Sequence, residues 1–177
     1  MAEDCLFCKI ASGEVPAKKV YEDANSIAFL DINPRNPGHA LVIPKAHAET
    51  IFQLDEEDLA SLFVAVRKVS IAVKSAMKAD GISISSSNGK AAGQVVNHMH
   101  VHVIPRFSSE GPVGLEGILP VKKLDDDSLS KVAETIRAGM GSPRPETAGP
   151  PPKTASEKPA KKEEKGDEEE EDLDFDF

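Results

Sequence analysis

The sequence predicts an α+β fold, because short segments with the length and alternation of strands occur together with two helical segments. Five segments have strand character, namely 18–22, 26–31, 39–44, 81–85 and 98–104. Two segments have the period of an amphipathic helix, namely 55–79 and 125–138. A chain of 177 residues is long enough for one domain with its own hydrophobic core.

The first strands flank a turn-rich connection at 31–38, where two prolines and a glycine interrupt regular structure. The third strand, 39–44, is almost entirely apolar, and His47 follows it closely. We therefore expect His47 just past the end of a strand.

The segment 55–79 is the clearest helix. Asp55 can cap its amino end, and the acidic residues at 56–58 suit the helix dipole. Apolar side chains recur every three or four residues as a core-facing stripe, namely Leu59, Leu62, Phe63, Val66, Val69, Val73 and Met77. Asp80 and Gly81 end the helix.

The segment 98–104 carries three of the five histidines of the chain. The three are His98, His100 and His102, and they alternate with Met99, Val101 and Val103. A strand would point all three imidazoles at one face and bury the apolar residues on the other. Same-face positions lie roughly 6.5–7 Å apart, so one phosphate or one metal ion can contact two rings. Because histidine can act as nucleophile, proton donor and metal ligand, the pattern predicts phosphate chemistry or a metal site.

A loop at 88–94, with glycines at 89 and 93, precedes the histidine segment. Glycines and small residues let backbone N–H groups approach an anion closely. Most such loops are plain hairpins, but the position of this one favours a role in phosphate binding.

Cys5 and Cys8 form a Cys-x-x-Cys pair. In a reducing compartment this spacing indicates a redox motif or half of a zinc site more often than a structural disulfide. Half a zinc site needs two more ligands, and histidines are available to supply them.

The charge distribution excludes several classes of protein. The net charge is −9, and residues 141–177, with 12 acidic and 6 basic residues, carry −6 of it. The nearly balanced remainder offers no basic face for nucleic acid. No apolar run approaches the roughly 18 residues needed to cross a bilayer. The acidic start lacks the plan of a secretion signal, so we expect a cytoplasmic or nuclear location.

The composition changes at residue 141, which predicts a domain at 1–140 followed by a tail at 141–177. The tail holds 6 of the 13 prolines and an unbroken acidic run at 167–172. Such a segment cannot bury enough apolar area to offset the entropy of ordering, so it is predicted to be disordered. Its end, 172–177, alternates Asp with Leu or Phe, which is typical of a docking motif for a protein partner or of a solubilising tail.

Together these residues resemble the histidine triad (HIT) family, whose signature is His-φ-His-φ-His-φ-φ with φ apolar. The segment 98–104 matches it completely, and the resemblance extends over about 4–107. Further matching segments are 15–18, 29–32, 37–39, 41–45 and 93–94. Within the family the chain is most similar to the histidine triad nucleotide-binding (Hint) branch, and its Cys-x-x-Cys start is similar to that of the zinc-containing members. The tail lies outside the resemblance.

The resemblance implies a fold and an activity. The fold is a five-stranded antiparallel sheet with two helices, usually paired as a homodimer through the long helix and a shared sheet. Family members bind purine nucleoside monophosphates and hydrolyse bonds at the α-phosphorus. In the Hint branch the bond is typically the P–N bond of a nucleoside phosphoramidate, and a nucleoside monophosphate is released. No organic cofactor is implied.

The family pattern also implies a role for each histidine of the site. His100 is the nucleophile and forms a nucleotidyl-histidine, which water then resolves. His102 donates to a non-bridging phosphate oxygen. His98 supports this array or binds zinc. His39 matches a family position that supports the triad.

The other site residues follow from the same resemblance. Asp31 matches the carboxylate that accepts from the ribose hydroxyls. The loop groups expected to hold the phosphate are Asn88 and the backbone at Gly93 and Gln94. The residues expected to form the base slot are Phe7, Ile10, Phe29, Ile32 and Leu41. The ligands expected to hold a structural zinc ion are Cys5, Cys8, His47 and His98.

One departure and three alternatives stay open. Many Hint relatives carry a serine directly after the Gly-Gln pair, at a nucleotide-binding position, but this chain has Val95 there. Protonation of the leaving group is therefore expected to be weaker or to depend on water. The alternative functions are a dinucleoside polyphosphate hydrolase, a nucleotide-responsive adaptor that acts through its acidic tail, and a zinc-binding protein that uses the triad itself as ligands.

Overall fold

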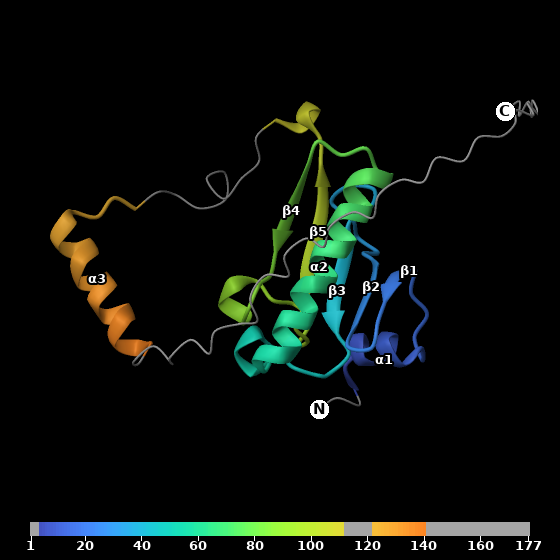
Figure 1. Ribbon diagram of the computed structural model, residues 1–177, viewed down its shortest axis with the longest axis horizontal. Coiled ribbons are helices and arrows are strands. Elements are labelled where there is room, and N and C mark those ends of the chain that lie inside the picture. The colour runs from blue at the N-terminus through green and yellow to red at the C-terminus, as the bar shows by residue number, and fades with distance from the viewer. Residues whose placement is uncertain (1–3, 112–121, 141–177) are drawn as a thin grey trace, which may run out of the picture. The chain divides into compact units, whose positions relative to one another are not determined.

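A computed structural model gives the structure of this chain and describes residues 4–111 and 122–140 (Figure 1). The chain divides into two compact units, Met1–Val121 and Lys122–Phe177. The regular elements of the first unit are α1 (Leu6–Ser12), β1 (Lys19–Glu22), β2 (Ser26–Leu30), β3 (Ala40–Pro44), α2 (Glu56–Ala76), β4 (Gly81–Ser85) and β5 (Val101–Arg106). The described element of the second unit is α3 (Asp126–Gly139).

The strands of the first unit form one sheet in the order β1-β2-β3-β5-β4. Every pair of neighbours is antiparallel, which confirms the expected five-stranded antiparallel sheet. β1 and β4 are the outer strands. β5 lies between β3 and β4, where His102 is opposite Leu41 on one side and Ser85 on the other.

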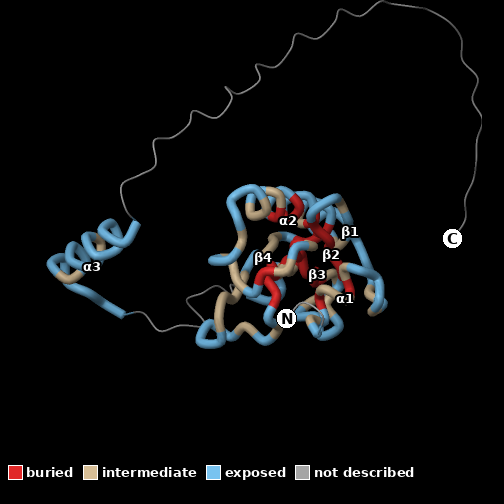
Figure 2. The backbone as a smooth tube through the Cα atoms, turned by 90° about the horizontal axis from the view of Figure 1, so that it is seen from below, coloured by how far each residue is buried: buried red, intermediate tan, exposed pale blue. Residues whose placement is uncertain are grey.

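Alternation along the strands divides their side chains between two faces of the sheet. The buried cluster on the α2 face consists of Ala28, Ala40, Val42, Leu62, Ala65, Val66, Val69, Val73, Met99, Val101 and Val103. The buried cluster on the α1 face consists of Phe7, Ile10, Ile27, Phe29, Leu41 and Ile43. Figure 2 shows that the buried segments gather in the strands and on the sides of the helices turned toward them. The sheet is therefore covered on both faces.

The long helix α2 begins as the sequence predicts. The Asp55 carboxylate accepts a hydrogen bond from the backbone N–H of Asp58 at 2.8 Å. Leu62, Val66 and Val69 are buried, but Phe63 is 44% exposed, so its assignment to the core-facing stripe was wrong. The reason is geometric, because Phe63 lies 100° around the helix from Leu62 and so points off the sheet-facing side.

The helix α1 was not predicted, so the described residues form three α-helices where two were expected. It begins after Cys5 and ends at Gly13, whose φ of 85° belongs to the left-handed region that favours glycine. Phe7 and Ile10 are its two buried residues and lie one turn apart. Seven residues are too few for hydrophobic periodicity to distinguish a helix from a loop.

The histidine strand is shifted relative to its prediction. Hydrogen-bonded pairing begins at Val101, so His98 and His100 precede β5 rather than lie within it. The strand also continues through Pro105 to Arg106. Because pairing with β3 stops at Val103, Pro105 has a neighbouring strand on one side only, where a missing N–H group is tolerated.

The second unit contains α3, which is capped by the Asp125 carboxylate at the N–H of Ser128. Its apolar side chains Leu129, Val132 and Ile136 are each about half exposed. The predicted tail at 141–177 lies outside the described residues, so its disorder and the boundary at 140 stay predictions. Among the described helices, none is both long and apolar enough to span a membrane.

Candidate active site

The three histidines of the signature lie on the α1 face, next to the ring of Phe7. Their apolar neighbours Met99, Val101 and Val103 belong to the α2 cluster, as the alternation predicts. The Phe7 ring centroid is 6.0 Å from that of His98 and 5.4 Å from that of His100. The ring centroids of His100 and His102 are 5.2 Å apart. His98 is fully buried, and His100 is 6% exposed.

The His100 ring is held in one tautomer by the backbone. Its Nδ1 lies 2.6 Å from the carbonyl oxygen of His98. Because a carbonyl oxygen can only accept, Nδ1 carries the proton and Nε2 keeps its lone pair. The Ser86 hydroxyl donates to the carbonyl oxygen of His100 itself at 2.8 Å and steadies the backbone there. His100 therefore presents an unprotonated nitrogen, the form that a nucleophile requires.

His102 has the opposite tautomer, which is set by His39. The backbone N–H of Arg35 donates to His39 Nδ1 at 3.2 Å, so the His39 proton resides on Nε2. His39 Nε2 lies 3.0 Å from His102 Nδ1 and donates to it. The proton of His102 is thereby left on Nε2, which makes that nitrogen a donor.

Burial, followed by the neighbouring His100 and His39 rings, lowers the pKa of His102 to about 4. Burial also lowers the pKa of His39, while the nearby Asp31 opposes this shift. The Asp31 Oδ2 atom is 3.6 Å from His39 Nδ1. At neutral pH the pair His39 and His102 is therefore uncharged and acts by the direction of its N–H groups.

His98 faces the amino-terminal cysteines rather than the open side of the site. Its Nε2 donates to the carbonyl oxygen of Pro44 at 2.9 Å, so its Nδ1 keeps a lone pair. Burial lowers the pKa of His98, which keeps the ring neutral. A neutral imidazole with a free Nδ1 is the form that binds a metal ion.

Four ligand atoms converge at this point, from Cys5, Cys8, His47 and His98, and all lie within 4.8 Å of one another. His98 Nδ1 is 3.4 Å from Cys5 Sγ, 3.5 Å from Cys8 Sγ and 3.3 Å from His47 Nδ1. His47 Nδ1 is 3.3 Å from Cys8 Sγ. Tetrahedral zinc with Zn–N of about 2.05 Å and Zn–S of about 2.3 Å needs N–N edges of about 3.3 Å and N–S edges of about 3.5 Å. The residues present fit a tetrahedral zinc ion.

The thiol chemistry of the cluster agrees with this geometry. Burial, followed by the hydrogen bond and charge of Cys5, raises the pKa of Cys8 to about 11. Two adjacent cysteines cannot both ionise easily without a cation, whereas a bound divalent ion deprotonates coordinating thiols outright. The cluster is thus built for a cation rather than for free thiolates.

Four of the five expected base-slot residues form one apolar wall. Phe7, Ile10, Phe29 and Leu41 pack in the same buried cluster, and the rings of Phe7 and Phe29 meet edge to face at 5.5 Å. Ile32 is 90% exposed and lies outside this cluster. Asp31 is half-buried, and its Oδ1 accepts from the N–H of Asn33 at 2.8 Å.

The loop at 88–94 is shaped by its own side chains. Asn88 Oδ1 accepts from the N–H of Ile51 at 2.8 Å, and Gln94 Oε1 accepts from the N–H of Gly89 at 2.7 Å. The N–H groups of Gly93 and Gln94 also have partners within the loop, at 3.0 and 3.3 Å. Asn88 and Gln94 therefore set the conformation of the loop in this state. The adjacent Val95 is 91% exposed.

Sequence reasoning missed three groups that orient the histidines or their backbone. The carbonyl of Pro44, the N–H of Arg35 and the hydroxyl of Ser86 each set the position or tautomer of a ring or its backbone. Their partners lie from 4 to 54 residues away along the chain. The Pro44 and Arg35 groups belong to the backbone and carry no residue-type signal, and the Ser86 hydroxyl lies outside the histidine motif.

Comparison with known proteins places this site in a family. The HIT domain model matches residues 12–109. The chain is 46% identical to an uncharacterized HIT-like protein of Methanocaldococcus jannaschii, over 72% of this chain and 96% of that one. It is 41% identical to the adenosine 5′-monophosphoramidase of Schizosaccharomyces pombe, over 63% of this chain and 80% of that one.

Solved structures agree with this assignment. A Streptococcus mutans protein superposes with a TM-score of 0.71 at 41% identity, covering 77% of this chain and 85% of that one. A zinc-bound histidine triad family protein of Mycobacterium smegmatis superposes with a TM-score of 0.60 at 32% identity, covering 79% and 97%. The sheet and the histidine cluster define a histidine triad domain, and the chain belongs to the HIT family.

Proposed function

We propose that this protein is a purine nucleoside phosphoramidase, a hydrolase that cleaves at the α-phosphorus through a nucleotidyl-histidine intermediate on His100. The observation that carries the proposal is the tautomer of His100, whose Nδ1–H is held by the His98 carbonyl and whose Nε2 lone pair is free. The phosphoramidase of Schizosaccharomyces pombe, at 41% identity, supports this choice of substrate.

The reaction takes two steps. In the first, His100 Nε2 forms a bond to the α-phosphorus, the P–N bond to the amine breaks, and the amine leaves with a proton from water. In the second, a water molecule attacks the phosphorus and gives its proton to the hydroxide left by the first step, the bond to His100 breaks, and a nucleoside monophosphate is released. Val95 has no hydroxyl group, so water is the proton source for the leaving group.

His102 stabilises the charge that develops in both steps. Its Nε2–H donates to a non-bridging phosphate oxygen, and the His39 hydrogen bond at 3.0 Å keeps that proton on Nε2. A neutral donor at this position serves over a wide pH range because its pKa is about 4.

The nucleoside is held on the α1 face. The wall of Phe7, Ile10, Phe29 and Leu41 takes the flat apolar surface of a purine base. Asp31 accepts hydrogen bonds from the ribose hydroxyls with the lone pairs that Asn33 leaves free.

A structural zinc ion held by Cys5, Cys8, His47 and His98 completes the site. Zinc would fix α1, and with it Phe7, against the histidines. The backbone of His98 then holds its carbonyl oxygen in place for His100.

A second copy of the chain is proposed to pair along the outer strand β4. Ile84 of β4 is 50% exposed, and Phe63, Val64 and Ile71 of α2 are between 44% and 55% exposed. An outer strand next to exposed apolar side chains is a surface suited to a homodimer. Sedimentation velocity would show a dimer, and Ile84→Lys would yield a monomer.

The test is turnover of an adenosine 5′-phosphoramidate compared with a diadenosine polyphosphate. We expect AMP release mainly from the phosphoramidate. His100→Ala should lower turnover by about 10⁴-fold or more and leave AMP binding nearly unchanged. Preferential turnover of the diadenosine polyphosphate would assign the protein to that class of hydrolase instead. AMP binding without turnover of either substrate would leave a nucleotide-binding adaptor.

A further inference from the structure

The peptide of His100 lies just outside the sheet. Hydrogen-bonded pairing of β5 begins at Val101. On the β3 side the last pair is Val42 with Val101, and on the β4 side it is Ser85 with His102. The ladder that fixes the rest of β5 therefore stops short of His100. Because a misplacement of about 1 Å can cost about 100-fold in rate, a nucleophile at this position needs another group to hold its backbone.

Ser86 supplies such a group. It directly follows the last residue of β4, and its hydroxyl donates to the carbonyl oxygen of His100 at 2.8 Å. The residue before the nucleophile is held as well, because the N–H of Met99 donates to the carbonyl oxygen of Ala48 at 2.6 Å. The side chain of Ser86 thus continues the hydrogen bonding of β5 beyond the end of the ladder.

Asn88 fixes the direction in which the Ser86 hydroxyl points. The N–H of Ile51 donates to Asn88 Oδ1 at 2.8 Å, so the other end of the amide is the donor Nδ2. Asn88 Nδ2 donates to Ser86 Oγ at 3.3 Å. Because a hydroxyl group has one proton, the Ser86 proton is left for the His100 carbonyl. The sulfur of Met99, 3.6 Å from Ser86 Oγ, is a weaker acceptor.

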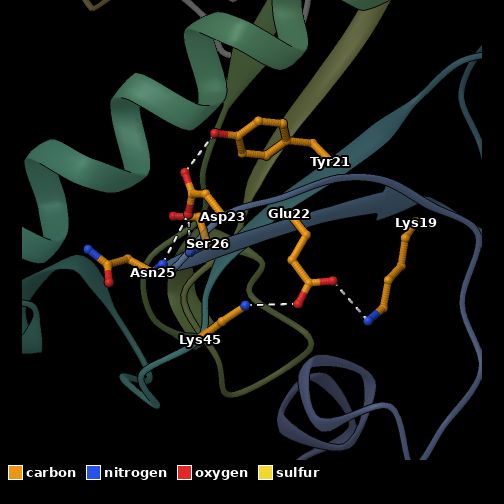
Figure 3. A network of polar contacts seen from close by, with 7 residues as sticks. All are labelled: Lys19, Tyr21, Glu22, Asp23, Asn25, Ser26 and Lys45. Atoms are coloured by element: carbon orange, nitrogen blue, oxygen red, sulfur yellow. Dashed lines mark hydrogen bonds and ion pairs between the residues drawn. The ribbon is translucent and has the colours of Figure 1, made fainter.

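A second set of hydrogen bonds holds the ring of His100. Its Nδ1–H donates to the carbonyl oxygen of His98 at 2.6 Å, and His98 Nε2 donates to the carbonyl oxygen of Pro44 at 2.9 Å. Pro44 ends β3, and the next residue, Lys45, is tied by an ion pair of 2.8 Å to Glu22 (Figure 3). The nucleophile is therefore held from two sides, its ring from the end of β3 and its backbone from the end of β4.

We infer that Ser86 is a positioning residue for His100, which acts through the His100 carbonyl group. The inference rests on the proposed function, in which His100 Nε2 attacks the α-phosphorus. The bond to His98 fixes how the ring is turned, whereas the bond from Ser86 fixes the peptide from which the side chain projects. Both are needed to direct the Nε2 lone pair along the line of attack.

The first test compares Ser86→Ala, Ser86→Thr and Ser87→Ala in the turnover of an adenosine 5′-phosphoramidate. Ser86→Ala should lower kcat about tenfold or more and change KM and AMP affinity less than about twofold, because it misdirects the nucleophile and keeps the groups that bind. Ser86→Thr retains the hydroxyl and should keep kcat within about threefold of the unsubstituted protein.

The matched control is Ser87→Ala, which removes a hydroxyl from the next residue of the chain. Ser87 is half-buried like Ser86, and its side chain makes no hydrogen bond to the residues that the structure describes. Its substitution should leave kcat unchanged.

A purely structural role for Ser86 would give a different result. Loss of folded protein would lower the number of AMP-binding sites per chain and leave kcat per site unchanged, and a distorted binding site would raise KM. Either result would overturn the inference. Unchanged kcat in Ser86→Ala, or equal losses in Ser86→Ala and Ser86→Thr, would also overturn it.

The second test does not depend on turnover. In protein labelled with ¹⁵N-histidine, the Nδ1 proton of His100 should exchange slowly with water, because it is hydrogen-bonded inside the site. Ser86→Ala should speed this exchange about tenfold or more, and Ser87→Ala should change it less than about twofold. Loss of turnover in His100→Ala together with unchanged exchange in Ser86→Ala would overturn this inference alone. Full turnover by His100→Ala would overturn the proposed function, and the inference with it.

Discussion

The α2 face and the α1 face of the sheet differ in what holds their side chains in place. The α2 face is an apolar layer in which Leu62 and Val66 are almost completely buried against Val101 and Val103. The α1 face combines an apolar wall with five histidines whose ring nitrogens have specific partners. Packing tolerates many side chains of similar volume, whereas each imidazole needs a defined donor or acceptor. The first face therefore carries stability, and the second carries chemistry.

The candidate zinc site of Cys5, Cys8, His47 and His98 would connect these roles on the α1 face, so loss of its metal should have the largest effect. We expect zinc removal to lower the free energy of unfolding by on the order of 5 kcal/mol. This is less than the zinc-binding free energy of zinc-finger peptides, which is about 10–16 kcal/mol, because the buried side chains of Phe7 and Ile10 also hold α1 in place. The measurement is denaturant unfolding before and after chelation, with zinc content by mass spectrometry. Cys8→Ser should lose both the metal and the stability. Freshly purified protein with far less than one zinc per chain would contradict this expectation.

A core substitution on the α2 face should affect stability alone. Leu62→Ala should cost about 3–4 kcal/mol of unfolding free energy, because Leu62 is fully buried. Turnover at a temperature where the variant is folded should stay the same, since Leu62 belongs to the buried cluster on the α2 face. Lys74→Ala on the exposed side of α2 is the control and should change stability by less than about 0.5 kcal/mol. A folded Leu62→Ala protein with reduced turnover would break the division between the two faces.

A substitution at His39 should affect chemistry alone. His39→Leu removes the donor that keeps the His102 proton on Nε2, so kcat should fall by about tenfold to a hundredfold. KM should change little, because His39 is buried behind His102. His39→Gln retains a side-chain N–H and should recover part of the activity. Equal losses in the Leu and Gln variants would show that His39 acts through packing instead.

The smallest effect is expected from pH. His102 has a pKa of about 4 in the folded protein against an ordinary value of 6.5, so between these values the unfolded chain binds the proton and the folded chain does not. Stability should therefore decrease as the pH falls from about 6.5 toward 4. Urea midpoints measured across this range should decline less steeply in His102→Gln. If the urea midpoint of His102→Gln declines with pH as steeply as that of the unsubstituted protein, then His102 does not contribute to this pH dependence.

Local patterns correctly predicted features whose residues lie close together in the chain. The alternation of 98–104 placed Met99, Val101 and Val103 on the α2 side and the imidazoles on the other, and Asp55 was correctly assigned as a helix cap. The same patterns failed for α1, which is too short to show a period, and for Phe63, which the stripe included although it faces solvent.

The sequence by itself determined the α+β class, the two-faced character of the strands and the identity of the histidines, because these depend on residue types within a few positions. The antiparallel pairing was expected only from the resemblance to the histidine triad family. Only the tertiary structure decided which nitrogen of each histidine carries its proton. That choice depends on the Pro44 carbonyl, 54 residues from His98, and on His39, 63 residues from His102. It also brought Cys5 within 3.4 Å of His98, 93 residues away. Such contacts arise from the order of strands in the sheet, which no local pattern contains.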